Sequence, residues 1–284
     1  MNVKKFSETE FTEYGLPHNR KEVFFDCLKM RYGLIVACGA LILLFLLPLF
    51  AVAVFGETSF SVFYEKNSAD PTAIEDGANI LKFYVSVASI PCLVIAALGF
   101  AGVYKIIRRL IWAEPVFFWR DFADGFKANG LQFGIAFAVF GAIIALDRLI
   151  LVMNLPNPVF GFLPTAVTFV AILPVFMTML SHSAVYNVGF FTLVKNSLLL
   201  FIKNVPINLL FVLIFAAFAA LDLLTITLLK YSLFVLITLF LSAPFVMARL
   251  LYDCSVFDRL INVRDYPEMV DKGLIRLEKI KDEY

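Results

Sequence analysis

Residues 149–194 contain no Asp, Glu, Lys or Arg, and this uncharged stretch is the strongest constraint on how the chain can fold. Other apolar runs of about 18 residues or more recur along the sequence, and such runs are long enough to cross the hydrocarbon core of a bilayer as helices. Of the 284 residues, 61% are hydrophobic and only 17% are charged, whereas soluble domains are about a quarter charged. The sequence therefore predicts an all-α membrane protein with several spans.

The apolar runs divide the chain into three regions. A polar N-terminal segment (1–32) precedes a six-span transmembrane domain (33–250), and a charged tail (251–284) follows it. The predicted spans are Gly33–Phe55, Ile80–Tyr104, Leu131–Met153, Phe162–Tyr186, Val205–Ile226 and Tyr231–Leu250. The first span is long enough to stay in the membrane, so we interpret it as an uncleaved helix rather than a signal peptide.

The distribution of Lys and Arg predicts the orientation of these spans. The N-terminal segment, the 105–130 and 187–204 connections and the tail from Arg249 hold 20 of the 24 Lys and Arg residues. Cytoplasmic loops carry such an excess. We therefore expect both termini in the cytoplasm. The formal net charge of only +1 gives no indication of nucleic-acid binding.

The stretch EPVFFWRDFADGFKANG (114–130) mixes aromatic and charged residues just before the third span. Its phenylalanines recur every four residues, which predicts an amphipathic helix along the cytoplasmic interface between spans 2 and 3. This helix either only connects spans 2 and 3 along the interface, or it also docks a cytoplasmic partner. The candidate docking residues are Glu114, Phe118, Arg120, Phe122, Asp124, Phe126, Lys127 and Asn129.

Residues 190–222 are similar in pattern to residues 117–147. In both 117–147 and 190–222 an aromatic pair opens a helical pattern, an Asn follows, and an Asp lies 18 residues further on. This similarity favours a second interfacial helix between spans 4 and 5, and it arises either from duplication or from chance matches in apolar sequence. The two Asp residues, Asp147 and Asp222, mark the outer span ends with Arg148, where they either cap helices or line an outer vestibule.

The interiors of the predicted spans contain no ionisable group, which argues against ion-coupled transport. Two prolines in one span, Pro164 and Pro174, indicate either packing kinks or a broken helix around a substrate cavity.

Phosphate-binding-loop, nucleophile-elbow and zinc-protease motifs are missing from the sequence. The four cysteines show no paired spacing. We therefore expect no enzymatic activity, no cofactor, no metal site and free thiols.

The stretch RLIWAEPVFFWRDFADGFKANG (109–130) resembles the most recognisable part of the YesL-like family of bacterial integral membrane proteins of unknown function. The end of the first span, LLPLFAVAVFG (46–56), is also similar to the pattern in that family. The residues that carry the match are Glu114, Val116, Phe117, Phe122, Phe126, Lys127 and Asn129. The resemblance implies a bacterial inner-membrane location and an association with carbohydrate uptake, and it implies no catalytic residues.

Three hypotheses for function follow. The first is an accessory protein for solute uptake that contacts transporter components. The second is a small uncoupled permease, based on the two prolines of the fourth span. The third is a membrane sensor or assembly factor, based on the acidic outer loop 56–79. The expected partners are the lipid bilayer, transporter components and further copies of the chain.

Overall fold

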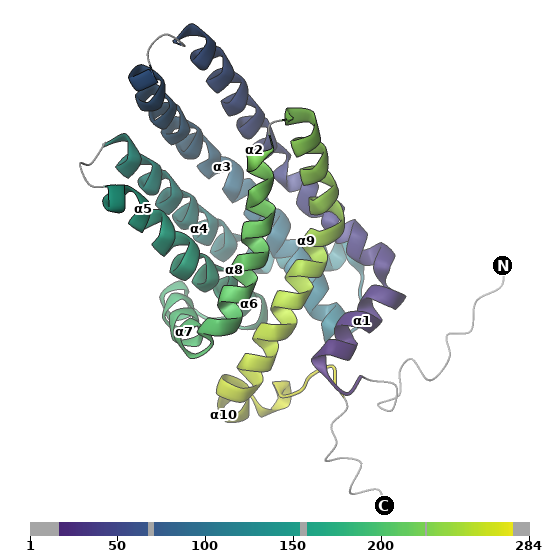
Figure 1. Ribbon diagram of the computed structural model, residues 1–284. Coiled ribbons are helices and arrows are strands. Elements are labelled where there is room, and N and C mark those ends of the chain that lie inside the picture. The colour runs from purple at the N-terminus through teal and green to yellow at the C-terminus, as the bar shows by residue number, and fades with distance from the viewer. Residues whose placement is uncertain (1–16, 68–70, 154–157, 225, 275–284) are drawn as a thin grey trace, which may run out of the picture.

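The computed structural model describes residues 17–67, 71–153, 158–224 and 226–274, and these residues form helices joined by short connections (Figure 1). The α-helices are α1 (Arg20–Met30), α2 (Tyr32–Lys66), α3 (Pro71–Ile111), α4 (Phe118–Val152), α5 (Pro158–Val167), α6 (Leu173–Val185), α7 (Phe190–Lys203), α8 (Val205–Ala219), α9 (Thr227–Phe257) and α10 (Val263–Asp265). Two π-helical segments, η3 (Thr168–Ile172) and η5 (Asp258–Asn262), and two 3₁₀ helices, η4 (Ala220–Leu223) and η6 (Pro267–Met269), complete the described part.

The long helices run alternately up and down in one bundle (Figure 1). Within the described residues, five helical segments are long and apolar enough to cross a membrane, and α7 with α8 forms a sixth if this bent pair counts as one span. The prediction of an all-α membrane protein is thereby confirmed. We call the end of the bundle that carries α1, α7 and α10 the basal end, and the opposite end the distal end.

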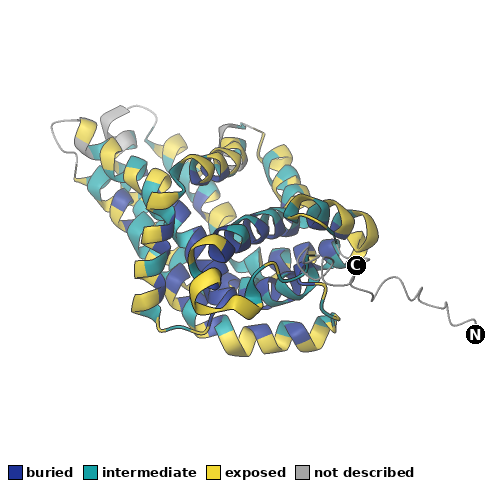
Figure 2. Cartoon of the chain, turned by 90° about the horizontal axis from the view of Figure 1, so that it is seen from below, coloured by how far each residue is buried: buried dark blue, intermediate teal, exposed yellow. Residues whose placement is uncertain are grey.

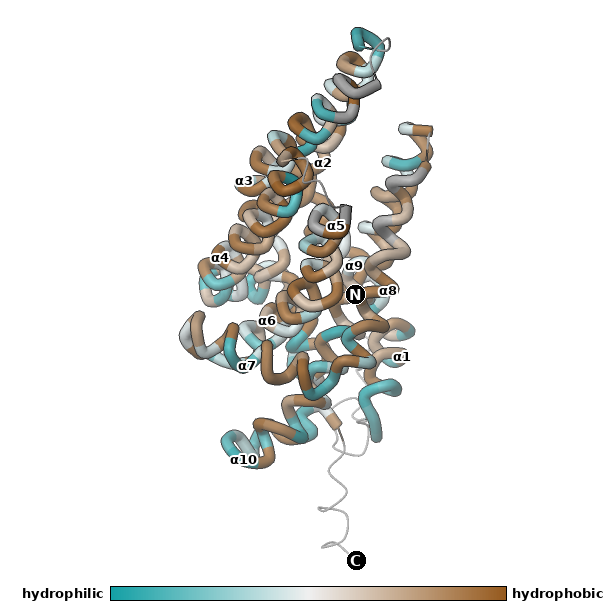
Figure 3. Tube along the Cα trace, turned by 60° about the vertical axis from the view of Figure 1, so that its left-hand side comes forward, coloured by the Kyte–Doolittle hydropathy of each residue, from teal (hydrophilic) through white to brown (hydrophobic). Residues whose placement is uncertain are grey.

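Most of the apolar surface of the helices faces outward. Within the most apolar window of each candidate span only 17–39% of the residues are buried. Phe55, Leu131 and Phe162 are among the large apolar side chains that are more than two-thirds exposed. Hydrophobic positions cover the middle of the bundle (Figure 3), while buried positions lie on its inner faces (Figure 2). A bilayer is the solvent that tolerates this arrangement, so the chain is a multi-pass membrane protein.

Small residues let the helices approach one another closely. A Cβ atom on Gly39 of α2 would lie 2.0 Å from the carbonyl oxygen of Leu239 in α9. A Cβ atom on Gly125 of α4 would lie 2.7 Å from the carbonyl oxygen of Ala101 in α3. Neither contact is possible with a larger residue unless the backbones separate. Helix association within membranes depends on such close backbone packing, because burial of apolar surface alone gains little there.

The predicted outer loop 56–79 is largely helical. Helix α2 continues to Lys66 and α3 begins at Pro71, so that only the residues between them connect the two helices. At 35 residues α2 is about 52 Å long, which exceeds the hydrocarbon core of about 30 Å. The prediction of a loop was wrong because α2 and α3 continue to pack on each other along this stretch. The Val85 side chain, for example, packs against Gly56.

The two similar segments of the sequence adopt different conformations. Residues 118–152 form the single helix α4, whereas α7 and α8 meet at 100°. Proline explains the bend, because Pro206 lacks an N–H group and its ring would clash with the preceding turn. Asn204 ends α7, and its side-chain amide donates to the carbonyl oxygen of Leu200 (3.0 Å). The segment between predicted spans 4 and 5 thus forms a separate helix, α7, which packs on α6 at the basal end, and its interfacial location stays a prediction.

Candidate functional site

The predicted docking residues lie at the basal end, although not on a helix of their own. Glu114 lies in the connection after α3, and Phe118 begins α4, which continues without a break through Gly125 and Gly130 into the third span. The helical conformation was predicted correctly. A separate interfacial helix between spans 2 and 3 was a wrong prediction, because glycine permits a bend but does not force one, and close packing on α3 keeps α4 continuous.

The first turns of α4 have two distinct faces. Asp121 and Gly125 are buried against α3, and the ring of Phe122 packs over Gly102. The opposite face is exposed, and it presents the aromatic and charged side chains of Trp119, Arg120, Asp124, Phe126 and Lys127, which we call the α4 face. The structure therefore divides the predicted docking residues into a packing set and an exposed set.

Asp121 fixes the start of α4. Its Oδ2 atom accepts a hydrogen bond from the backbone N–H of Phe117 (2.7 Å), and its Oδ1 atom lies 2.7 Å from Nη1 of Arg109. The carboxylate is fully buried. Arg109 also approaches Glu114 (3.7 Å), and Glu114 in turn pairs with Nζ of Lys272 (2.8 Å). These contacts bind the connection between α3 and α4 to the C-terminal segment.

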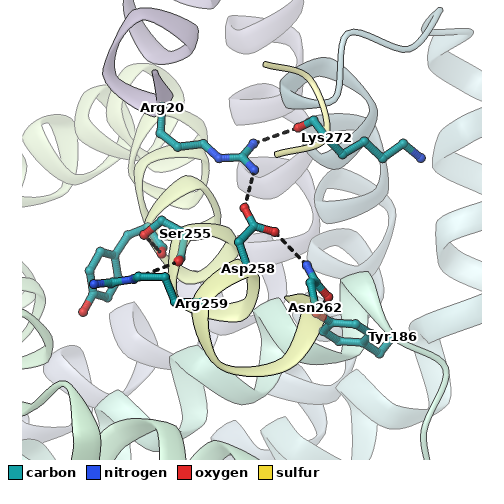
Figure 4. A network of polar contacts seen from close by, with 8 residues as sticks. Arg20, Tyr186, Ser255, Asp258, Arg259, Asn262 and Lys272 are labelled. Carbon is teal, nitrogen blue, oxygen red and sulfur yellow. Dashed lines mark hydrogen bonds and ion pairs between the residues drawn. The ribbon is translucent and has the colours of Figure 1, made fainter. Parts of the chain in front are cut away.

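Lys272 leads into a second group of contacts (Figure 4). Its carbonyl oxygen accepts from Nη1 of Arg20 (2.9 Å), while Nη2 of Arg20 lies 2.7 Å from Asp258. Asn262 donates to the other carboxylate oxygen of Asp258 (2.7 Å) and accepts from the hydroxyl of Tyr186. Burial raises the pKa of Tyr186 above its ordinary value, so the hydroxyl keeps its proton and acts as a donor.

Together these contacts form one basal polar network that connects six parts of the chain. It joins α1, α3, the connection after α3, α4, the connection after α6 and the C-terminal segment. Gly273 supports the docking of that segment. Its φ of +85° suits glycine, and a Cβ atom would lie 2.4 Å from the carbonyl oxygen of Ile111. The members of the network are Arg20, Arg109, Glu114, Asp121, Tyr186, Asp258, Asn262 and Lys272.

Sequence reasoning missed most of this network. Asp258 and Asn262 are spaced to share one helix face, which is a local signal. Their partners Arg20 and Tyr186 are separated from them by 238 and 76 positions. No spacing rule connects residues so far apart. The network therefore becomes visible only when the basal end is folded.

A buried ion pair contradicts the expectation that the span interiors lack ionisable groups. Helix α9 continues to Phe257, so Arg249 and Asp253 lie within it, at 1% and 2% exposure, rather than in a solvated tail. Nε of Arg249 donates to Asp253 (2.9 Å), and Nη2 donates to Thr178 of α6 (2.6 Å). The guanidinium also lies over the ring of Phe211 in α8, 4.9 Å from its centroid. The pair thus joins α6, α8 and α9.

The proposed outer vestibule is only partly visible. Asp147 (7% exposed) and the half-buried Arg148 lie near the distal end of α4. Among the described residues no ion pair joins these two side chains to each other. Asp222 falls in η4, also at the distal end, but its side chain lies outside the described residues. A vestibule formed by these three residues stays a prediction.

No family model matches the chain, and no curated protein or solved structure matches it either. Within the described residues, no group of three or more His, Cys, Asp and Glu side chains could hold a metal ion. All four cysteines are free, as predicted. Fold and composition define the class of the protein as a multi-pass helical membrane protein.

Proposed function

We propose that the protein is a non-enzymatic accessory component of a bacterial solute-uptake system, with carbohydrate as the solute class. The observation that carries the proposal is the α4 face, which stays exposed while the charged groups around it are used in the basal polar network. Trp119 is 70% exposed and packs edge to face on Phe118, with ring centroids 5.1 Å apart. The resemblance of this region to YesL-like proteins supports the link to uptake.

The chemistry of the α4 face suits a protein partner. The guanidinium of Arg120 lies 4.1 Å from the ring centroid of Phe117, which holds the charge at the surface. Tryptophan and arginine are enriched among the residues that dominate binding energy at protein interfaces. A surface that faces the hydrocarbon core would instead lack the charges of Arg120, Asp124 and Lys127 in the middle of the aromatic residues.

The orientation in this proposal places the basal end in the cytoplasm of a bacterial inner membrane. The described N- and C-terminal segments meet at the basal end through Arg20 and Asp258. Among the described residues, most Lys and Arg side chains belong to the segments that form this end. Positive residues are retained on the cytoplasmic side during insertion. The α4 face would then be accessible to cytoplasmic and membrane components of a transporter.

Charge reversal of the α4 face tests the proposal. Tagged protein from the native host, purified in mild detergent, is expected to retain transporter components that mass spectrometry identifies. The double variant Arg120→Glu/Lys127→Glu is expected to lose them while its thermal unfolding is unchanged. The matched control is Lys195→Glu/Lys203→Glu, since both lysines are exposed on the basal helix α7. Retention of the same complex by the α4 variant would contradict the proposal, as would a wild-type protein that purifies alone.

A small permease is the second candidate, and one observation favours it. The segment η3 is π-helical and lies between Pro164 and Pro174. The hydroxyl of Thr168 in η3 is buried and has no hydrogen-bond partner among the described residues. Single π-helical turns within α-helices occur frequently at functional sites. Uptake of labelled sugars by liposomes that contain the purified protein, abolished by Thr168→Val, would support this candidate. Inert liposomes across a sugar panel would exclude it for those sugars.

A further inference from the structure

A groove of about 330 Å³ runs between α1 and α9 at the basal end. Its walls are formed by the apolar side chains of Phe24, Phe25, Ala248 and Leu251, and by Tyr252 and Ser255 of α9. Its volume falls at the lower end of the range of about 300–1,000 Å³ that is typical of ligand sites. The groove is separate from the α4 face and from the contacts of the basal polar network. Arg20 is the one residue that both lines the groove and belongs to the network.

One end of the groove is positively charged. Arg20 and Lys21 line it, and Arg259 donates from Nε to the carbonyl oxygen of Ser255 (3.2 Å). Figure 4 shows Ser255 and Arg259 together on one side of α9. Asp258 offsets the charge of Arg20. Lys21 and Arg259 are exposed, and neither forms an ion pair with a described residue. The groove thus combines an apolar wall with one uncompensated cation of its lining, Lys21, and a second cation, Arg259, that is bonded to the lining residue Ser255.

Helix α1 exposes apolar and basic side chains next to one another. Phe25 is 66% exposed and Met30 is 70% exposed, while Lys21 and Lys29 extend from the same short helix. Exposed apolar side chains next to lysines are expected where acyl chains meet anionic head groups. The only acidic residue of its first turn, Glu22, accepts from the backbone N–H of His18 (2.7 Å) and from the side chain of Asn19. It is therefore engaged in capping the helix.

From this combination we infer that the groove between α1 and α9 binds an anionic phospholipid. The phosphate group lies against Lys21 and Arg259, and an acyl chain lies along Phe25, Ala248 and Leu251. A zwitterionic lipid fits the apolar wall equally well, but its choline group meets the same positive charges. The site is consequently selective for the charge of the head group.

Binding of defined lipids to the full-length protein in detergent tests the inference. Native mass spectrometry is expected to show tighter binding of dioleoyl phosphatidylglycerol than of dioleoyl phosphatidylcholine. Each positive charge at a membrane surface contributes enough to change affinity about fivefold, so Lys21→Gln is expected to weaken phosphatidylglycerol binding about fivefold and Lys21→Glu about thirtyfold. Phe25→Ser is expected to weaken it about tenfold through loss of apolar contact.

Controls on α7 separate this site from general effects of charge and apolarity. Lys195→Glu and Phe191→Ser remove an exposed lysine and an 89% exposed ring from a helix remote in sequence from α1 and α9. Both variants are expected to bind phosphatidylglycerol as the wild type does. Equal affinity for the two lipids, or unchanged binding by Lys21→Glu, would overturn the inference. Displacement of the lipid by millimolar inorganic phosphate would identify a site for free anions instead, and would overturn it as well.

Discussion

Arg20 and Asp258 form an ion pair with 2.7 Å between Nη2 and Oδ2, although 238 positions of sequence separate them. The pair joins α1 to the π-helical turn that follows α9. Both side chains are nearly buried, at 13% and 10% exposure. The charges are therefore screened much less than those of a surface pair. The contact closes the N-terminal helix onto the C-terminal segment at the basal end.

Asp258→Ala is expected to lower the free energy of unfolding by about 3 kcal/mol, because it leaves the guanidinium of Arg20 nearly buried without its partner. Thermal unfolding in detergent measures the loss, and limited trypsin digestion should show faster cleavage near Arg264 and Lys272. The control is Asp265→Ala, since Asp265 is 54% exposed in a pair with Arg264 and its loss should have no measurable effect. Equal stability of the two variants would contradict a stabilising role for the pair.

Sequence reasoning succeeded where the signal is local and apolar. The apolar runs identified five of the six predicted spans, whereas the predicted span Val205–Ile226 is long enough only when α8 is combined with α7. Pro206 explains why one of two similar segments bends. Sequence reasoning failed at Arg249, which was counted among the positive charges of the cytoplasmic tail. The buried position of Arg249 depends on Asp253 one turn further on and on Thr178 of another helix. Such compensation is a property of the folded bundle.

Arg249→Met is expected to lower the free energy of unfolding by about 3–5 kcal/mol, because the carboxylate of Asp253 then stays buried without a cation. The double variant Arg249→Met/Asp253→Leu removes both charges and is expected to recover most of that loss. Thermal unfolding of the two variants in the same detergent checks this order. A double variant less stable than Arg249→Met would show that Asp253 stabilises the bundle even without Arg249, and would contradict this explanation.

Gly39→Ala is expected to destabilise the contact between α2 and α9 by about 1–3 kcal/mol, because the added methyl group would overlap the carbonyl oxygen of Leu239. The matched control is Gly33→Ala in the first turn of the same helix, where no described atom lies within 4 Å of the added Cβ. Alanine has the higher helix propensity, so the control is expected to be neutral or slightly stabilising. If both variants unfold at the wild-type temperature, the two helices are not in close contact.

Cys27 of α1 is expected to react slowly with alkylating reagents. Burial of the thiol, with a smaller effect of the neighbouring Asp26 carboxylate, raises its pKa to about 11. The thiolate is the reactive form. Because the folded-state pKa lies above the ordinary value, little thiolate exists at neutral pH and the amount grows as the pH rises toward about 11. The rate of iodoacetamide modification should therefore increase about tenfold per pH unit from pH 7 to 9.5.

Peptide mass spectrometry follows Cys27 separately from the other three cysteines. Protein unfolded in dodecyl sulfate serves as the control, and its rate should level off above about pH 8.5, the ordinary pKa of a free thiol. A plateau near pH 8.5 in the folded protein would show that the thiol is accessible to water. It would also contradict the packing of α1 on the bundle, because Cys27 and Val23 are the buried residues of that helix.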